Sequence, residues 1–96
     1  MIRWTDRAVA DLIAIGDYIA HDNPGAARAW VERLRQRAHA ASELPNSGRV
    51  VPEIARSDVR EVFVRNYRIV YRVIPNEIVV LTVFEGHRLL ELDPDE

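Results

Sequence analysis

Arginine is the residue type in this sequence with the greatest capacity to bind an anionic group. All 13 basic residues are arginine, and none is lysine. The planar guanidinium donates two parallel hydrogen bonds to a phosphate or a carboxylate, so arginines gathered on one surface can hold either ligand. A genome-wide compositional bias gives the same count, and both explanations stay open. The candidates for partner or target binding are Arg33, Arg37, Arg60, Arg68, Arg72 and Arg88.

Histidine is the second residue type suited to chemistry near neutral pH, because its charge changes in that range. His87 stands next to Arg88 and is the candidate general acid of this sequence. General acid–base catalysis with proton transfer in two directions needs a second titrating group beside it. No second proton-transfer group accompanies His87, so a polar loop residue is the alternative interpretation. We therefore assign no catalytic residue.

Thiol and metal chemistry are not expected. The absence of cysteine excludes disulfides, thiolate zinc sites and cysteine nucleophiles. His21 and His39 have only Asp22 and Glu43 as nearby candidate co-ligands, which is too few for a structural metal site. We predict neither a metal nor a cofactor.

Charge is segregated along the chain. Residues 1–27 carry two arginines against four aspartates, residues 28–72 carry ten arginines against five acids, and residues 73–96 carry one arginine against six acids. Such asymmetry can mark a surface that faces a polyanion. Four of the 15 acids lie in residues 91–96, so the rest of the chain has a net charge of +2. That is too little for tight nonspecific binding to nucleic acid and favours a protein partner; direct nucleic-acid binding stays open.

The length and composition predict one domain. A chain of 96 residues that is 48% hydrophobic has room for a single core spanning residues 1–96, with residues 91–96 as an acidic tail. Arg3, Asp6 and Arg7 interrupt any signal-peptide pattern, and the apolar stretch at 78–84 is too short for a bilayer. We expect a cytoplasmic protein that has no membrane partner.

Two amphipathic helices are predicted after a short strand at residues 1–4. Thr5 can cap a helix whose apolar positions 8, 12, 15 and 19 form one stripe, and this helix should end near His21. Asn23-Pro24 then begins a second helix, with apolar residues at 27, 30, 31, 34, 38 and 41. The two form a helical hairpin.

Strands are predicted after a break at residues 44–48 and an ordered loop at 49–58. Segments 59–64, 67–74 and 78–84 are rich in β-branched and aromatic residues. Tight turns at Arg65-Asn66, with Asn66 tolerating positive φ, and at Pro75-Asn76 join them. The predicted fold is α+β: an N-terminal strand and a two-helix hairpin packed on a three- to four-stranded antiparallel sheet.

The turns also predict the register of the strands. Ile74 should pair with Glu77 and Arg68 with Val83, which places Thr82 and Phe84 on the apolar face that packs against the helices. Arg68 and Arg72 then stand out from the opposite face, which is partly apolar and open, and Arg88 can curl toward it. The structural alternative is that both arginines pair with Glu61 on the neighbouring strand. Arg33 and Arg37 are either partner contacts or a solvated helix face.

The chain resembles the ParE/RelE superfamily of type II toxins along nearly its whole length. The most specific piece is Asn66-Tyr67-Arg68-Ile69-Val70-Tyr71-Arg72. The remaining pieces are Trp4-Thr5, Ala8, Asp11-Leu12, Tyr18-Ile19-Ala20, Asn23-Pro24, residues 45–53, Arg60-Glu61 and Gly86-His87-Arg88.

The resemblance implies that this protein is a toxin. The branches of the superfamily differ in the cellular machine that they attack. RelE-like members are ribosome-dependent mRNA endonucleases, whereas ParE-like members poison DNA gyrase. Arg68 and Arg88 match family arginines, but the strand at 61–64 has no lysine and the chain after Leu90 has no tyrosine, both of which the nuclease branch uses. These departures favour the ParE-like branch, which carries plasmid-stabilising toxins.

Three functions therefore remain as hypotheses. The first is a gyrase poison that is neutralised by a cognate, ParD-like antitoxin. The second is a ribosome-dependent endoribonuclease that uses Arg68, His87 and Arg88. The third is a non-toxic module that binds an antitoxin and represses its own operon.

Overall fold

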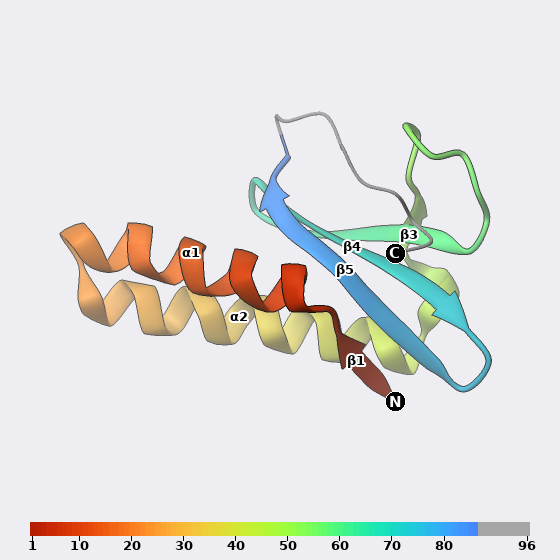
Figure 1. Ribbon diagram of the computed structural model, residues 1–96, viewed down its shortest axis with the longest axis horizontal. Helices are drawn as coiled ribbons and strands as arrows, with labels where there is room; N and C mark the ends of the chain where they lie inside the picture. Colours follow the sequence, from red (N-terminus) through yellow and green to blue (C-terminus); the bar gives the residue numbers. More distant parts are fainter. Residues whose placement is uncertain (87–96) are drawn as a thin grey trace.

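Two helices lie against one face of a five-stranded sheet in the computed structural model, which describes residues 1–86 (Figure 1). The predicted α+β class, helical hairpin and three-stranded meander are confirmed. The elements are β1 (Ile2–Trp4), α1 (Asp6–Asp22), α2 (Pro24–Glu43), a 3₁₀ turn (Pro45–Ser47), β2 (Arg49–Val50), β3 (Val59–Val64), β4 (Tyr67–Ile74) and β5 (Glu77–Glu85).

The sheet is mixed and has one more strand than we expected. Its order is β1-β5-β4-β3-β2, with β1 parallel to β5 and the other neighbours antiparallel. The predicted loop at 49–58 begins with β2, where Arg49 pairs with Glu61 and Val50 with Arg60. A strand of two residues is too short to show the alternation of apolar and polar residues that identifies a strand, and Pro52 prevents it from extending.

One residue makes the turn between the helices. The Asn23 N–H donates to the carbonyl of Ile19 at the end of α1, and its side-chain Oδ1 accepts from the N–H of Ala26 at the start of α2. Pro24 follows as the first residue of α2, where its missing N–H costs no helical hydrogen bond. Because Asn23 satisfies backbone groups of both helices, the hairpin needs no longer connection.

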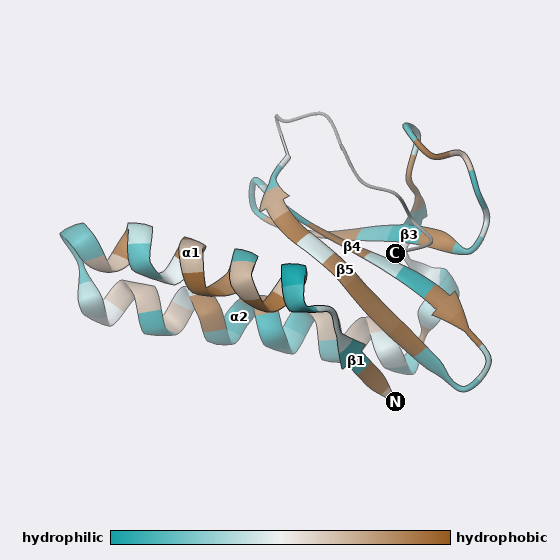
Figure 2. Ribbon diagram, viewed as in Figure 1, coloured by the Kyte–Doolittle hydropathy of each residue, from teal (hydrophilic) through white to brown (hydrophobic). Residues whose placement is uncertain are grey.

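The main core lies between the helices and the sheet. Small residues bring the elements close together: a Cβ on Gly16 would lie 3.0 Å from Val31 Cγ2 of the facing helix. Figure 2 shows the apolar stretch of β5 running beside the helices. The buried members are Ala8, Leu34, Ala38, Ala41, Val62, Val64, Ile69, Tyr71, Ile78, Val80 and Val83.

A β-bulge in β5 overturns part of the predicted register. Ile74 does pair with Glu77, but Val70 pairs with Thr82 and Tyr71 with Val80, so Leu81 is an extra residue. The displaced groups find side-chain partners. The Thr5 hydroxyl donates to the Leu81 carbonyl at 3.0 Å, and the Asp11 carboxylate accepts from the Thr82 hydroxyl and the Val83 N–H.

The bulge changes which side chains face the helices. Arg68 pairs with Phe84, not with Val83 as predicted. Val83 joins the helix-side core, whereas Phe84 packs with the cluster on the opposite face. The placement of Phe84 against the helices was therefore wrong, because a one-residue insertion exchanges the faces of later side chains. Thr82 pairs with Val70 of the opposite face, although its hydroxyl still reaches Asp11 of α1.

The face opposite the helices carries a second apolar cluster. Val51 and Ile54 from the segment after β2 pack there on residues of β3, β4 and β5. The Val73 N–H donates to the Asp58 carbonyl at 2.7 Å and ties the end of this segment to β4. The prediction that this face is open was wrong where residues 51–58 cover it.

Both predicted hairpin turns are present. Arg65-Asn66 joins β3 to β4 and Pro75-Asn76 joins β4 to β5. Asn76 has a φ of 67°, but in the first turn it is Arg65, at 54°, and not Asn66 that adopts positive φ.

Replacing Thr5 tests how the first helix is attached to the bulge. Thr5 Oγ1 accepts from the Ala8 N–H at 3.0 Å and donates to the Leu81 carbonyl, so Thr5→Ala removes both hydrogen bonds. We expect a loss of about 1–2 kcal/mol in the free energy of unfolding, measured by urea denaturation. Thr5→Ser keeps the hydroxyl and should retain most of the stability; equal stability of the alanine variant would contradict this role.

Candidate functional site

The arginine that best matches the family pattern is buried between two carboxylates. Arg68 is 5% exposed, and Glu61, on the neighbouring strand, is 1% exposed. Arg68 Nε donates to Glu61 Oε1 at 2.8 Å. Its Nη1 and Nη2 donate to the two carboxylate oxygens of Glu53 at 2.8 and 2.9 Å. The predicted pairing of Arg68 with Glu61 is confirmed, and the prediction that Arg68 projects into solvent was wrong.

Glu61 also binds a second arginine. Its Oε2 accepts from Arg49 Nε at 2.7 Å and from Arg49 Nη2, and the Arg49 side chain is mostly exposed. The two guanidinium groups lie over aromatic rings as well: Arg49 is 5.4 Å from the ring centre of Phe63, and Arg68 is 5.1 Å from that of Phe84. Arg49, Glu61, Arg68 and Glu53 thus form one charged cluster, which we call the ionic cluster.

The ionic cluster holds Arg68 in its charged state and offsets that charge. The hydrogen bonds that Arg68 donates to Glu53, together with its contacts to Glu61, raise the pKa of Arg68 against the opposing effect of burial. Because two carboxylates occupy the three guanidinium nitrogens, a phosphate could bind Arg68 only by displacing them. This arrangement suits a structural ion pair better than a phosphate-binding site.

Arg60 binds backbone rather than an anion. Its Nε donates to the Ser57 carbonyl at 2.9 Å, and its Nη1 donates to the carbonyls of Gly48 and Asn46 at 3.0 and 3.3 Å. Tyr71 reaches the same segment, where its hydroxyl donates to the Pro45 carbonyl at 2.6 Å. Burial raises the pKa of Tyr71, so this phenol stays protonated as the donor.

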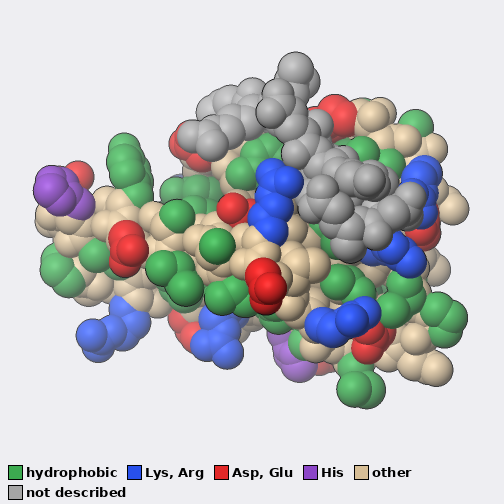
Figure 3. Space-filling view, in the orientation of Figure 1, with side chains coloured by type: hydrophobic (Ala, Val, Ile, Leu, Met, Phe, Trp, Pro, Cys, Tyr) green, Lys and Arg blue, Asp and Glu red, His purple; other side chains and the backbone are tan. Residues whose placement is uncertain are grey.

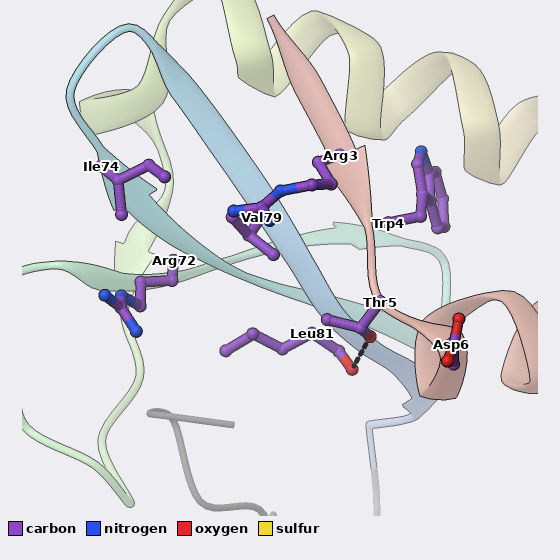
Figure 4. Close-up of a pocket in the computed structure, with 8 residues that line it drawn as sticks. All are labelled: Arg3, Trp4, Thr5, Asp6, Arg72, Ile74, Val79 and Leu81. Atoms are coloured by element: carbon purple, nitrogen blue, oxygen red, sulfur yellow. Dashed lines mark hydrogen bonds between the residues drawn. The ribbon is translucent and has the colours of Figure 1, made fainter.

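Arg72 lies beside a different carboxylate from the one predicted. Its Nε is 4.0 Å from Asp58 Oδ2, while Arg56 donates to both oxygens of Asp58 at 3.0 and 2.7 Å. The hydrogen bonds from Arg56 lower the pKa of Asp58. Arg72 lines a hollow of about 260 Å³ together with Arg3 and Leu81. Figure 4 shows these side chains around it. The predicted pairing of Arg72 with Glu61 was wrong.

Arg33 and Arg37 lie on the surface of α2, as expected for either of their two interpretations. Arg33 is exposed and Arg37 is half-buried. The Arg33 guanidinium is 4.8 Å from the ring centre of Trp30, which with Trp4 packs against the main core. His87, Arg88 and the acidic tail at 91–96 lie outside the described residues, so their roles stay predictions.

Sequence reasoning missed Glu53 and the exposed Phe63. Glu53 stands in a segment with no periodic pattern, 15 residues before Arg68, and nothing in its neighbours indicates that contact. Phe63 pairs with Arg68 across the first hairpin, and it is 43% exposed. An aromatic residue on the solvent side of an edge-proximal strand is the one signal that could have identified it.

An apolar groove lies along α1 where it meets α2. It has a volume of about 530 Å³, and Val9 and Ile13 on its border are 45% and 59% exposed. Figure 3 shows hydrophobic side chains spaced along the helices on the face in view. We call this the helical groove; its lining is Trp4, Val9, Leu12, Ile13, Gly16, Asp17, Val31 and Arg35.

Two further features bear on partners and ligands within residues 1–86. Neither helix in this part of the chain is long and apolar enough to cross a bilayer. Over the same residues, the acids and histidines do not gather into a group of three or more that could hold a metal ion.

Replacing Arg68 tests whether it stabilises the fold. Arg68→Met leaves Glu61 and Glu53 without their shared cation in a buried site, so we expect a loss of about 3 kcal/mol in the free energy of unfolding by urea denaturation. Arg33→Met removes an exposed arginine and should change stability by no more than about 0.5 kcal/mol. Equal stability of the two variants would show that the cluster is dispensable.

Comparison with known proteins agrees with this fold. Residues 2–90 match the model of the ParE toxin of the type II toxin–antitoxin system parDE. Toxin Y4kP of Sinorhizobium fredii is 40% identical over 91% of this chain and 88% of its own length. Toxin RelE2 of Caulobacter vibrioides is 38% identical over 90% of this chain and 94% of its own.

A solved structure, the chromosomal ParDE toxin–antitoxin system from P. aeruginosa, has the same fold. Its TM-score is 0.72 with 26% sequence identity, and the match covers 88% of this chain and 92% of the other. The strand, helical hairpin and sheet that carry the ionic cluster and the helical groove are thus shared with a ParDE protein. The chain belongs to the ParE family of toxins of type II toxin–antitoxin systems.

Proposed function

We propose that this toxin stops growth by poisoning DNA gyrase and that it does so without chemistry of its own. The observation that carries the proposal is the enclosure of Arg68 by Glu61 and Glu53. A ribonuclease of the RelE-like type needs a free cation on the sheet to stabilise the scissile phosphate. Here that cation is buried and already paired.

The residues around Arg68 support the same conclusion. The strand that pairs with it, β3, offers Glu61 and Phe63 near this position and has no lysine. The described residues near the ionic cluster supply no histidine, and proton transfer to a leaving oxygen needs a group that titrates near neutral pH. Inhibition by binding alone requires no proton transfer.

We further propose that the cognate antitoxin neutralises the toxin by docking in the helical groove. An apolar concave surface between two helices suits the apolar face of a partner segment. Val9 and Ile13 would be buried by such a segment, and Asp17 and Arg35 on the border can pair with its polar residues. Exposed apolar side chains in one concave surface are typical of binding sites.

A supercoiling assay tests the gyrase proposal. Purified toxin should block the supercoiling of relaxed plasmid by gyrase and should trap cleaved, linear DNA. Unchanged supercoiling at micromolar toxin would contradict the proposal. Adding purified antitoxin should restore activity, and this serves as the control for nonspecific inhibition.

Primer extension on translated mRNA tests the alternative mechanism. We expect no new cuts in the ribosomal A site when the toxin is expressed, because Arg68 is occupied. Cuts that disappear in an Arg68→Lys variant would favour the ribosome-dependent endonuclease. Expression without the antitoxin should arrest growth if the protein is a gyrase poison or an endonuclease. A non-toxic module that represses its own operon would not arrest growth.

A charge placed in the helical groove tests the antitoxin site. Ile13→Asp should weaken antitoxin binding about tenfold or more, because the carboxylate would be buried against the partner's apolar side chains. Isothermal titration measures the affinity. Leu44→Asp is the matched control, since Leu44 is 68% exposed but lies outside the groove. Equal weakening by both variants would argue against this docking site.

A further inference from the structure

A second groove lies between α2 and the β3–β4 hairpin. It is shallow, with a volume of about 450 Å³. Arg33, Arg37 and Arg65 contribute to its lining, and Phe63 lies on its border. We call it the arginine groove; its lining is Arg33, Gln36, Arg37, Ala40, Phe63, Val64 and Arg65.

Among the described residues, the arginines of this groove differ from most other arginines in having no acidic neighbour. Within residues 1–86, no carboxylate lies within ion-pair distance of Arg33, Arg37 or Arg65. The two acids closest to them along α2 are engaged elsewhere, because Glu32 is 3.8 Å from Arg35 and Glu43 is 3.6 Å from His39. In the part of the chain that the structure describes, no carboxylate therefore offsets the positive charge of the groove.

Phe63 adds an exposed apolar residue to the border of this charged surface. Its side chain is 43% exposed although it belongs to a strand of the sheet, and the Arg49 guanidinium lies 5.4 Å from its ring centre. Aromatic residues and arginine are the types enriched at the centre of protein interfaces, whereas a purely electrostatic site needs no exposed ring. The combination favours a ligand that has both acidic and apolar groups.

We propose that the arginine groove binds an acidic segment of the toxin's protein target, with an apolar side chain of that segment on Phe63. This inference rests on the proposed function, in which the target is gyrase. Carboxylates of the segment would pair with Arg33, Arg37 and Arg65 and supply the missing counter-charge. A protein is favoured over DNA because the chain carries a net charge of −2 and the groove is one local patch.

The arginine groove is separate from the helical groove. The two share no lining residue, and they lie on different sides of α2. Target binding and antitoxin binding should therefore respond to different substitutions. Antitoxin binding can therefore serve as the control when residues of the arginine groove are replaced.

The test compares two triple variants with the same change in charge. R33Q/R37Q/R65Q neutralises the arginine groove, and R3Q/R7Q/R28Q neutralises three arginines outside it. We expect the toxin concentration that half-inhibits gyrase supercoiling to rise tenfold or more for the first variant and to change less than twofold for the second. Antitoxin binding should be unchanged in both.

Further measurements distinguish a loss of target binding from a loss of folding and from binding to nucleic acid. R33K/R37K/R65K keeps the charges and should retain most of the inhibition, and thermal unfolding by circular dichroism checks that each variant is folded. Full inhibition by folded R33Q/R37Q/R65Q would overturn the proposal. Binding of the wild-type toxin to linear plasmid DNA at about 0.15 M salt, lost in the same variant, would overturn it in favour of a nucleic-acid ligand.

An error in the proposed function, namely a target other than gyrase, can be told apart from an error in the arginine-groove proposal. If the wild-type toxin does not inhibit gyrase, gyrase is not the target, and growth arrest on expression becomes the measurement. The arginine-groove proposal then still predicts that R33Q/R37Q/R65Q loses growth arrest while R3Q/R7Q/R28Q keeps it. Arrest by both variants would overturn it whatever the target is.

Discussion

The pairing of Arg68 with Glu61 and Glu53 is the interaction on which the rest of the structure depends. It joins β3, β4 and the segment that follows β2 at one buried point. Removing one member of such a cluster leaves an uncompensated charge in the interior, which costs far more than the intact pair contributes. The loop at 51–58 is held to the sheet by this cluster, and its apolar residues then cover the second core.

The cluster also determines what the surface can do. Because Arg68, Arg60 and Arg72 lie against carboxylates or backbone carbonyls, three of the six predicted partner contacts serve the fold. Arg33 and Arg37 on α2 and Arg65 in the first hairpin turn line a groove that Phe63 borders. One helix-side surface is apolar and the other is cationic, which suits the two binding roles proposed above.

Local patterns predicted most of the elements, because their causes are local. Thr5 and Asn23 cap the helices through side-chain bonds within three residues, and the two-residue turns set the hairpin pairings of Phe63 with Arg68 and of Ile74 with Glu77. The bulge at Leu81 could not be predicted in this way. It is stabilised by Thr5 and Asp11, which lie 70 or more residues away, and no pattern in β5 itself indicates it.

The sequence by itself determined the α+β class, the helical hairpin, the meander and, through its resemblance, the toxin family. These follow from periodicity, capping and turn residues, whose effects act within a few positions of the chain. Only the tertiary structure decided which arginines are free. Arg68 and Arg33 are the same residue type, and what separates them is whether a carboxylate from a distant segment is folded against the guanidinium, as Glu53 is for Arg68.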